Sequence, residues 1–158
     1  MIPQKMHFDG VIFKVPFFGY QEKAKKTVSK LVYAQYCCPI KRRFNKGVRK
    51  TDYLQHYFED PKYEGKKMSL STLIEIDRSL EDLVTEKHYK TIKSKVLFMI
   101  GSGDSVVNNE DARRIFDEMD CEKHWIEYVN IDHNIFAESE YLNEVVNDMA
   151  TFILSPSE

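Results

Sequence analysis

An acidic residue and a histidine follow two apolar segments in the second half of the sequence. Asp104 stands in the stretch 101–107, and His133 comes 29 residues later. A carboxylate that accepts a hydrogen bond from an imidazole fixes its tautomer and stabilises the imidazolium that forms when the ring takes up a proton. These residue types in this order indicate two members of a nucleophilic triad, with Asp104 as the orienting acid and His133 as the general base.

Simpler roles stay open for the same residues. An Asp that follows a Gly often caps a turn, and a single His is often structural. The stretch Gly101-Ser102-Gly103 could also bind a phosphate at the end of a strand. It lacks the Gly-x-Gly-x-x-Gly and Gly-Lys-Ser/Thr patterns of nucleotide-binding loops, so we rank phosphate binding last.

The apolar pattern predicts three strands. The run Lys95–Gly101 is continuously apolar after its first residue, which is typical of a strand buried on both faces of a parallel sheet. A short β-rich run between Gly10 and Pro16 predicts a buried strand. A third strand is predicted over 125–131.

Helices are predicted between and after these strands. Ser69 or Ser71 can cap a first helix, and Asn108 or Asn109 can cap a second one over 109–119. The apolar residues predicted to face the core are Leu73, Ile76, Leu80 and Leu83 in the first helix, Ala112, Ile115, Phe116 and Met119 in the second, and Leu142, Val145, Val146, Met149 and Ile153 in a closing helix.

This order predicts an α/β fold with a parallel sheet of about three strands, flanking helices and a helical cap. In such sheets the carboxyl ends of the strands meet at one edge. Because adjacent parallel strands lie about 4.8 Å apart, Asp104 and His133 should lie within hydrogen-bonding distance of each other.

Composition limits the class of protein. The chain has 158 residues, of which 42% are hydrophobic and 30% charged, as expected for one soluble domain. The longest apolar runs are far shorter than the ~18 residues that a membrane span needs. Cys37, Cys38 and Cys121 have no metal-binding spacing, so we expect reduced thiols in a cytoplasmic protein with no metal and no cofactor.

Charge is concentrated in one segment. Residues 21–50 hold ten basic side chains and one acidic one, a net charge of +9, and residues 1–20 carry +1. The total of −2 therefore leaves −12 for residues 51–158. A basic segment of this kind favours peripheral contact with an anionic membrane. A solvated helix face is the simpler alternative, and we expect no nucleic-acid partner.

Two sequence patterns surround the acid and the histidine, Gly101-x-x-Asp104-x-Val106-Val107 and His133-x-Ile135-Phe136-x-Glu138. They resemble the loops that present the catalytic Asp and the catalytic His in the α/β-hydrolase superfamily, in the branch of monoacylglycerol lipases, lysophospholipases and serine aminopeptidases. The segment Phe8–Ile12 with Pro16 resembles the strand after the nucleophile helix, and Asp60-Pro61 with the helix from Ser69 resembles the end of the lid.

The family's nucleophile motif, Gly-x-Ser-x-Gly, does not occur in this sequence, and neither does its early oxyanion-hole loop. The resemblance therefore implies the C-terminal portion of one hydrolase domain over residues 1–158, with a lid at about 20–68. It also implies a small lipid ester as substrate and a Ser supplied from outside this chain. The alternative is a catalytically inactive remnant or a binding module, and we expect the chain alone to be inactive.

Overall fold

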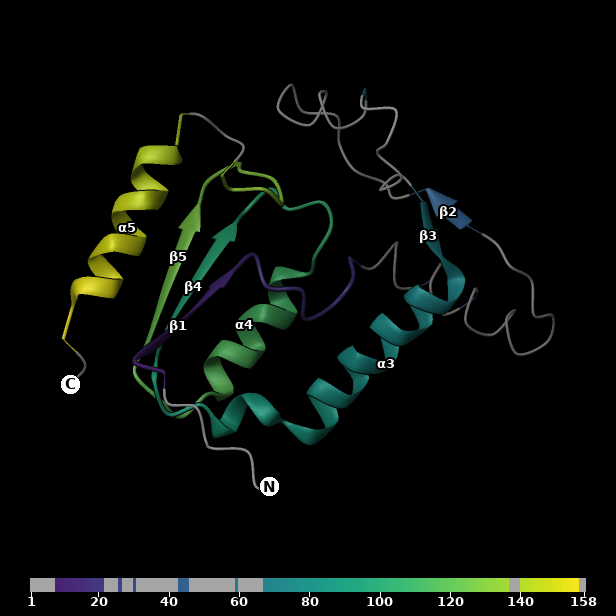
Figure 1. Ribbon diagram of the computed structural model, residues 1–158, viewed down its shortest axis with the longest axis horizontal. Coiled ribbons are helices and arrows are strands. Elements are labelled where there is room, and N and C mark those ends of the chain that lie inside the picture. Colours follow the sequence, from purple (N-terminus) through teal and green to yellow (C-terminus); the bar gives the residue numbers. More distant parts are fainter. Residues whose placement is uncertain are drawn as a thin grey trace.

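A three-stranded parallel sheet forms the centre of the protein (Figure 1). The computed structural model describes residues 8–21, 67–136 and 140–156, together with 26, 30, 43–45 and 59. The strand order is β1 (Gly10–Lys14), β4 (Lys95–Gly101) and β5 (Lys123–Tyr128). The other elements are β2 (Arg43–Asn45), β3 (Lys67–Ser69), α3 (Leu70–Glu86), the 3-10 helix η1 (His88–Thr91), α4 (Asn109–Glu118) and α5 (Leu142–Leu154).

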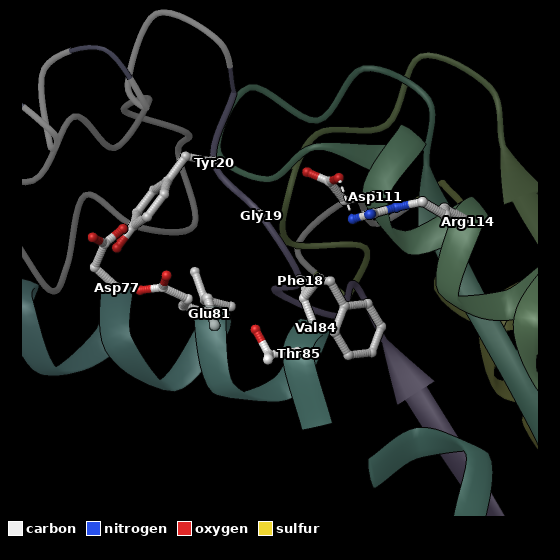
Figure 2. A pocket seen from close by; sticks show the side chains of 10 residues that line it. Phe18, Gly19, Tyr20, Asp77, Glu81, Val84, Thr85, Asp111 and Arg114 are labelled. Carbon is white, nitrogen blue, oxygen red and sulfur yellow. Dashed lines mark hydrogen bonds and ion pairs between the residues drawn. The ribbon is translucent and has the colours of Figure 1, made fainter. Parts of the chain in front are cut away.

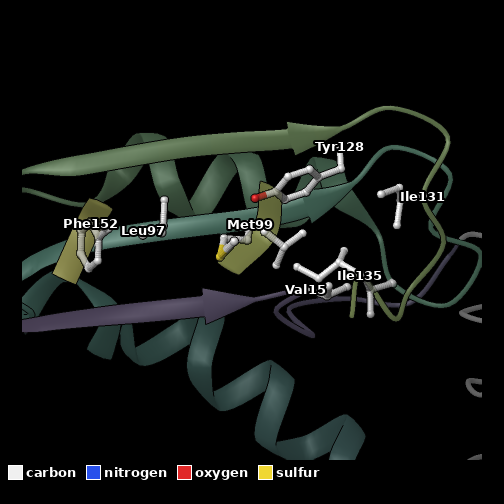
Figure 3. Packing of buried hydrophobic residues seen from close by; sticks show 9 residues of the cluster. Val15, Leu97, Met99, Tyr128, Ile131, Ile135 and Phe152 are labelled. Atoms are coloured by element: carbon white, nitrogen blue, oxygen red, sulfur yellow. The ribbon is translucent and has the colours of Figure 1, made fainter. Parts of the chain in front are cut away.

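The central strand β4 is buried along its whole length and has the bounds that the sequence predicts. Its side chains alternate between the two faces of the sheet, as the period of a strand requires. Leu97 and Met99 pack into a cluster with Val145 and Phe152 of α5 (Figure 3). Helices α5 and α4 thus cover opposite faces of one sheet (Figure 1).

Helix α4 also matches its prediction. The side chain of Asn108 accepts a hydrogen bond from the backbone N–H of Glu110 at 3.0 Å, which caps the helix. All four residues of its predicted apolar face are buried against Val96, Phe98 and Ile100 of β4. This packing fixes the start of α4, and with it the loop that carries Asp104.

Other elements differ from their predictions because tertiary contacts outweigh local pattern. Strand β1 is half-buried rather than buried, since β4 is its one neighbour in the described sheet. Strand β5 ends at Tyr128 rather than at residue 131. The chain turns at Asn130, which has a φ of 61°. In α3 the predicted apolar stripe is only half-buried, and Ile74 is the residue that is buried.

Strands β2 and β3 pair antiparallel, although the sequence predicts a helical cap at about 20–68. Helix α5 buries Val145 and Phe152, whereas three residues that the sequence predicts to face the core are exposed: Leu142 at 40%, Val146 at 49% and Ile153 at 62%. The described residues leave out most of the expected lid at 20–68 and most of the basic segment 21–50. They also leave out Cys37 and Cys38. Cys121 is a half-buried free thiol, and its burial raises the thiol pKa.

No helix in the described part of the chain is long and apolar enough to cross a membrane.

Two lysines at the starts of β4 and β5 cap the ends of the helices. The ammonium of Lys95 donates to the carbonyl of Phe152 at 2.8 Å, to the hydroxyl of Ser155 at 3.1 Å, and to the Ser155 carbonyl. Lys123 donates in the same way to three carbonyls at the end of α4. Carbonyls at a helix C-terminus lack partners within the helix and favour a cation, so these lysines tie each helix to the sheet.

We expect Lys95→Met to destabilise the fold by about 1–3 kcal/mol, because the change keeps the aliphatic stem but removes the ammonium that donates to the carbonyls of Phe152 and Ser155. Urea unfolding followed by circular dichroism measures this. The matched control is Lys93→Met, which removes an ion pair with Asp120 whose side chains are 68% and 92% exposed. It should change stability by less than about 0.5 kcal/mol. Equal effects of the two variants would contradict the capping role.

Candidate active site

Asp104 and His133 lie together at the edge of the sheet where β4 and β5 end. The Nδ1 atom of His133 lies 2.9 Å from Oδ2 of Asp104. The two strands are adjacent and parallel, so the loops that follow them leave from the same edge. This confirms the expected hydrogen-bonding distance. The roles of the two residues as acid and base stay predictions.

The two oxygens of Asp104 serve different partners. Its Oδ2 atom is the oxygen that lies next to the His133 imidazole. Its Oδ1 atom accepts hydrogen bonds from the backbone N–H groups of Val106 at 2.7 Å and Val107 at 2.9 Å. Asp104 therefore also caps the turn, which is the simpler role that its sequence context allows. An ionised carboxylate only accepts hydrogen bonds, so Nδ1 of His133 carries the proton that lies between the two side chains.

Burial differs sharply between the two partners. The side chain of Asp104 is 0% exposed, whereas that of His133 is 42% exposed. A buried carboxylate needs hydrogen-bond donors to offset the loss of water, and the two backbone N–H groups and the imidazole supply them. The acid is thus held inside the fold, and the imidazole remains accessible to a reaction partner.

The glycines of the acid loop allow the two loops to touch. A Cβ atom at Gly101 would come too close to the backbone carbonyl of Ile131. The N–H groups of Ser102 and Gly103 donate to the carbonyls of Tyr128 and Ile131, each at 2.9 Å. These amides are therefore already used by the histidine loop, which argues against phosphate binding by Gly101-Ser102-Gly103.

A segment far away in the sequence supports the acid loop from another side. After β1, Val15 turns the chain with a φ of 45°, a conformation that is costly for a β-branched residue. The segment then reaches the acid loop, where the side-chain amide of Gln21 donates to the carbonyls of Asp104 at 2.9 Å and Val107 at 2.7 Å. Sequence reasoning missed Gln21, because no periodicity links residues that are 83 positions apart.

Ser105 and Asp132, the residues next to the pair, also bond to each other. Oδ1 of Asp132 accepts hydrogen bonds from the N–H of Ser105 at 2.9 Å and from its hydroxyl at 3.0 Å. It also accepts one from the N–H of His133 at 2.8 Å. Sequence reasoning gave these residues no role. Their positions, one beside the acid and one beside the histidine, are the signal that could have suggested one.

A separate cavity of about 410 Å³ lies between α3, α4 and the segment after β1 (Figure 2). Its lining includes Asp77, Glu81 and an ion pair between Asp111 and Arg114 at 2.9 Å, but neither Asp104 nor His133. Burial and, to a lesser degree, the charge of Asp77 raise the pKa of Tyr20 in its wall to about 12.

Within the described ranges, no group of three His, Cys, Asp or Glu side chains is placed to hold a metal ion.

Comparisons with solved structures find this fold in lipases. Similar structures are a monoacylglycerol lipase from Paleococcus ferrophilus (21% identity, TM-score 0.73) and a soluble variant of monoglyceride lipase from Saccharomyces cerevisiae in complex with a substrate analogue (15%, 0.71). A third is DcsB in complex with its substrate analogue (16%, 0.54). The matches cover 92%, 90% and 91% of this chain but 58%, 54% and 55% of those chains. The chain therefore spans little more than half the length of these proteins.

No curated protein matches the sequence. A protein-family model described as "Serine aminopeptidase, S33" matches residues 1–140, which is most of the chain. The parallel sheet and its flanking helices are those of part of a monoacylglycerol lipase fold. The chain therefore belongs to the serine aminopeptidase S33 family of α/β-hydrolases.

Proposed function

We propose that this chain supplies the acid and the general base of a serine hydrolase that cleaves a small lipid ester. Asp104 is the acid and His133 the base. The serine nucleophile comes from residues outside this sequence, which has no Gly-x-Ser-x-Gly motif. The observation that carries the proposal is the 2.9 Å hydrogen bond between a fully buried carboxylate and a partly exposed imidazole.

In this mechanism the proton on Nδ1 of His133 stays in its hydrogen bond to Asp104. The other ring nitrogen, Nε2, takes the proton of the serine hydroxyl as its oxygen attacks the ester carbonyl, and passes it to the alcohol that leaves. Water then attacks the acyl-enzyme, with the same imidazole as base. The carboxylate of Asp104 stabilises the imidazolium in both steps and fixes which nitrogen is free to accept a proton.

The open edge of the sheet supports a nucleophile supplied from elsewhere. Strand β1 has β4 as its one partner among the described strands. Helix α5 also exposes the apolar side chains of Val146 and Ile153, at 49% and 62%. Both features fit a chain that packs against further residues of a hydrolase domain. A lipid ester is the proposed substrate because two of the similar structures are lipases that act on monoglycerides by name.

The isolated chain should show no serine-hydrolase activity, because without a serine next to Nε2 and an oxyanion hole the Asp104–His133 pair has no nucleophile to activate except water. A fluorophosphonate probe followed by intact-mass spectrometry measures this, with a monoacylglycerol lipase as the positive control. Stoichiometric labelling of one Ser, lost in His133→Ala, would contradict the proposal that the nucleophile lies outside this sequence.

Asp104→Asn should reverse the tautomer of the neutral His133 ring. The backbone donors of Val106 and Val107 will hold the amide oxygen in the place of Oδ1. The NH₂ group then faces Nδ1, which must become an acceptor, so the proton moves to Nε2. In an enzyme with a working serine, such a change lowers kcat by roughly 10⁴-fold.

The ¹⁵N shifts of the imidazole, measured above the pH at which the ring is protonated, report which nitrogen carries the proton. The matched control is Asp148→Asn, which removes a carboxylate that accepts the Tyr128 hydroxyl at 2.7 Å and should leave the tautomer unchanged. If the ring keeps its proton on Nδ1 in Asp104→Asn, the carboxylate does not set the tautomer.

A further inference from the structure

The two loops of the candidate site are joined by two neighbouring side-chain contacts. Asp104 lies within hydrogen-bonding distance of His133. Ser105, which follows Asp104, donates a hydrogen bond to Asp132, which precedes His133. The second contact uses both a backbone donor and a side-chain donor of Ser105. One carboxylate is therefore bound to the residue that follows the acid and to the backbone of the histidine.

We propose that Asp132 is a positioning residue that holds the His133 imidazole against Asp104 by clamping the histidine loop to the acid loop through Ser105. This inference rests on the proposed function, because it assigns Asp132 a role toward the same pair. It goes beyond that function because it names a residue outside the triad on which the geometry of the pair depends.

The different burial of the two partners explains why a clamp is needed. Asp104 is fixed by burial and by two backbone donors, but the His133 side chain is 42% exposed. An imidazole with this much solvent around it is restrained by fewer packing contacts than a buried side chain. A misplacement of ~1 Å in a catalytic group can cost about 100-fold in rate, so the path of the histidine backbone matters as much as the hydrogen bond itself.

Asp132 restrains that path directly. Its Oδ1 accepts the N–H of His133 at 2.8 Å, which orients the peptide from which the imidazole projects. The same oxygen accepts the N–H of Ser105 at 2.9 Å, and Oδ2 lies 3.3 Å from the Ser105 hydroxyl. Because Ser105 directly follows Asp104, these bonds set the separation between the acid and the histidine.

The conservative change Asp132→Asn should preserve the clamp. Its amide oxygen can accept both backbone N–H groups. Its NH₂ group then takes the place of Oδ2, where the Ser105 hydroxyl can act as an acceptor instead of a donor. Asp132→Ala removes all of these bonds, and Ser105→Ala removes only those of the hydroxyl.

The experiment measures the His133 Nδ1–H proton in the ¹⁵N-labelled chain by NMR, with its exchange rate against water as the readout. In Asp132→Ala the resonance should be lost or its exchange accelerated by about tenfold or more, as for loss of a hydrogen bond to a charged group. In Asp132→Asn it should be retained. The matched control Asp148→Ala removes a carboxylate–hydroxyl bond, to Tyr128, that involves none of Asp104, Ser105, Asp132 and His133, and should leave the resonance unchanged.

A folded Asp132→Ala variant, judged by circular dichroism, with an unchanged Nδ1–H resonance and exchange rate would overturn the proposal. If Asp132→Ala fails to fold, Asp132→Leu decides, because Leu keeps a branched side chain of similar shape at this half-exposed position but accepts no hydrogen bond from Ser105 or His133. Faster exchange in that variant supports the clamp, and an unchanged rate overturns it. None of these measurements requires catalysis. If the chain stays inactive even when the rest of a hydrolase domain supplies its serine, while the His133 proton still responds to Asp132, the proposed function is refuted and the clamp stands.

Discussion

The hydrogen bond between Asp104 and His133 depends on one geometric constraint, which is that two loops leave the same edge of a parallel sheet with their backbones in contact. Gly101 makes this contact possible, since its missing side chain leaves room for the carbonyl of Ile131. The N–H of Gly103 then bonds to the same carbonyl. Without this close approach, a short side chain such as Asp could not reach an imidazole on the neighbouring loop.

The acid loop is supported from three directions. Its own turn supplies the N–H groups of Val106 and Val107, the segment after β1 supplies the amide of Gln21, and the histidine loop supplies the carboxylate of Asp132. Burial of a carboxylate is costly unless its lone pairs are used. The N–H groups of Val106 and Val107 and the His133 imidazole use those of Asp104, which explains how the fold accommodates a fully buried acid beside a partly exposed base.

The elements that the sequence predicts well are those whose burial is complete and regular. Lys95–Gly101 is apolar throughout because both faces of β4 are covered, and α4 carries its cap and its apolar face within ten residues of chain. Strands β2 and β3 are three residues each, too short for an alternating pattern to be recognised. In α5 the apolar residues form a broad stripe that holds both Val145 and Val146, so periodicity could not tell the first, which is buried, from the second, which is exposed.

The sequence likewise predicts only part of the candidate site. The order and flanking residues of Asp104 and His133 indicated the pair, because strand ends in a parallel sheet converge at one edge. Gln21, Ser105 and Asp132 were not predicted, since their contacts join loops and follow no period in the sequence. The Gly101-Ser102-Gly103 stretch shows the opposite case, in which a pattern that could bind phosphate serves close backbone packing instead.

The most direct test of this account is hydrolysis of a monoacylglycerol by the chain when it is joined to the part of the Paleococcus ferrophilus monoacylglycerol lipase that it does not cover. The account expects that part to supply the nucleophilic serine, with His133 and Asp104 of this chain as base and acid. The account predicts turnover and fluorophosphonate labelling of that serine, both of which are lost in His133→Ala. A folded fusion protein whose serine reacts equally well with and without the His133 imidazole would contradict it.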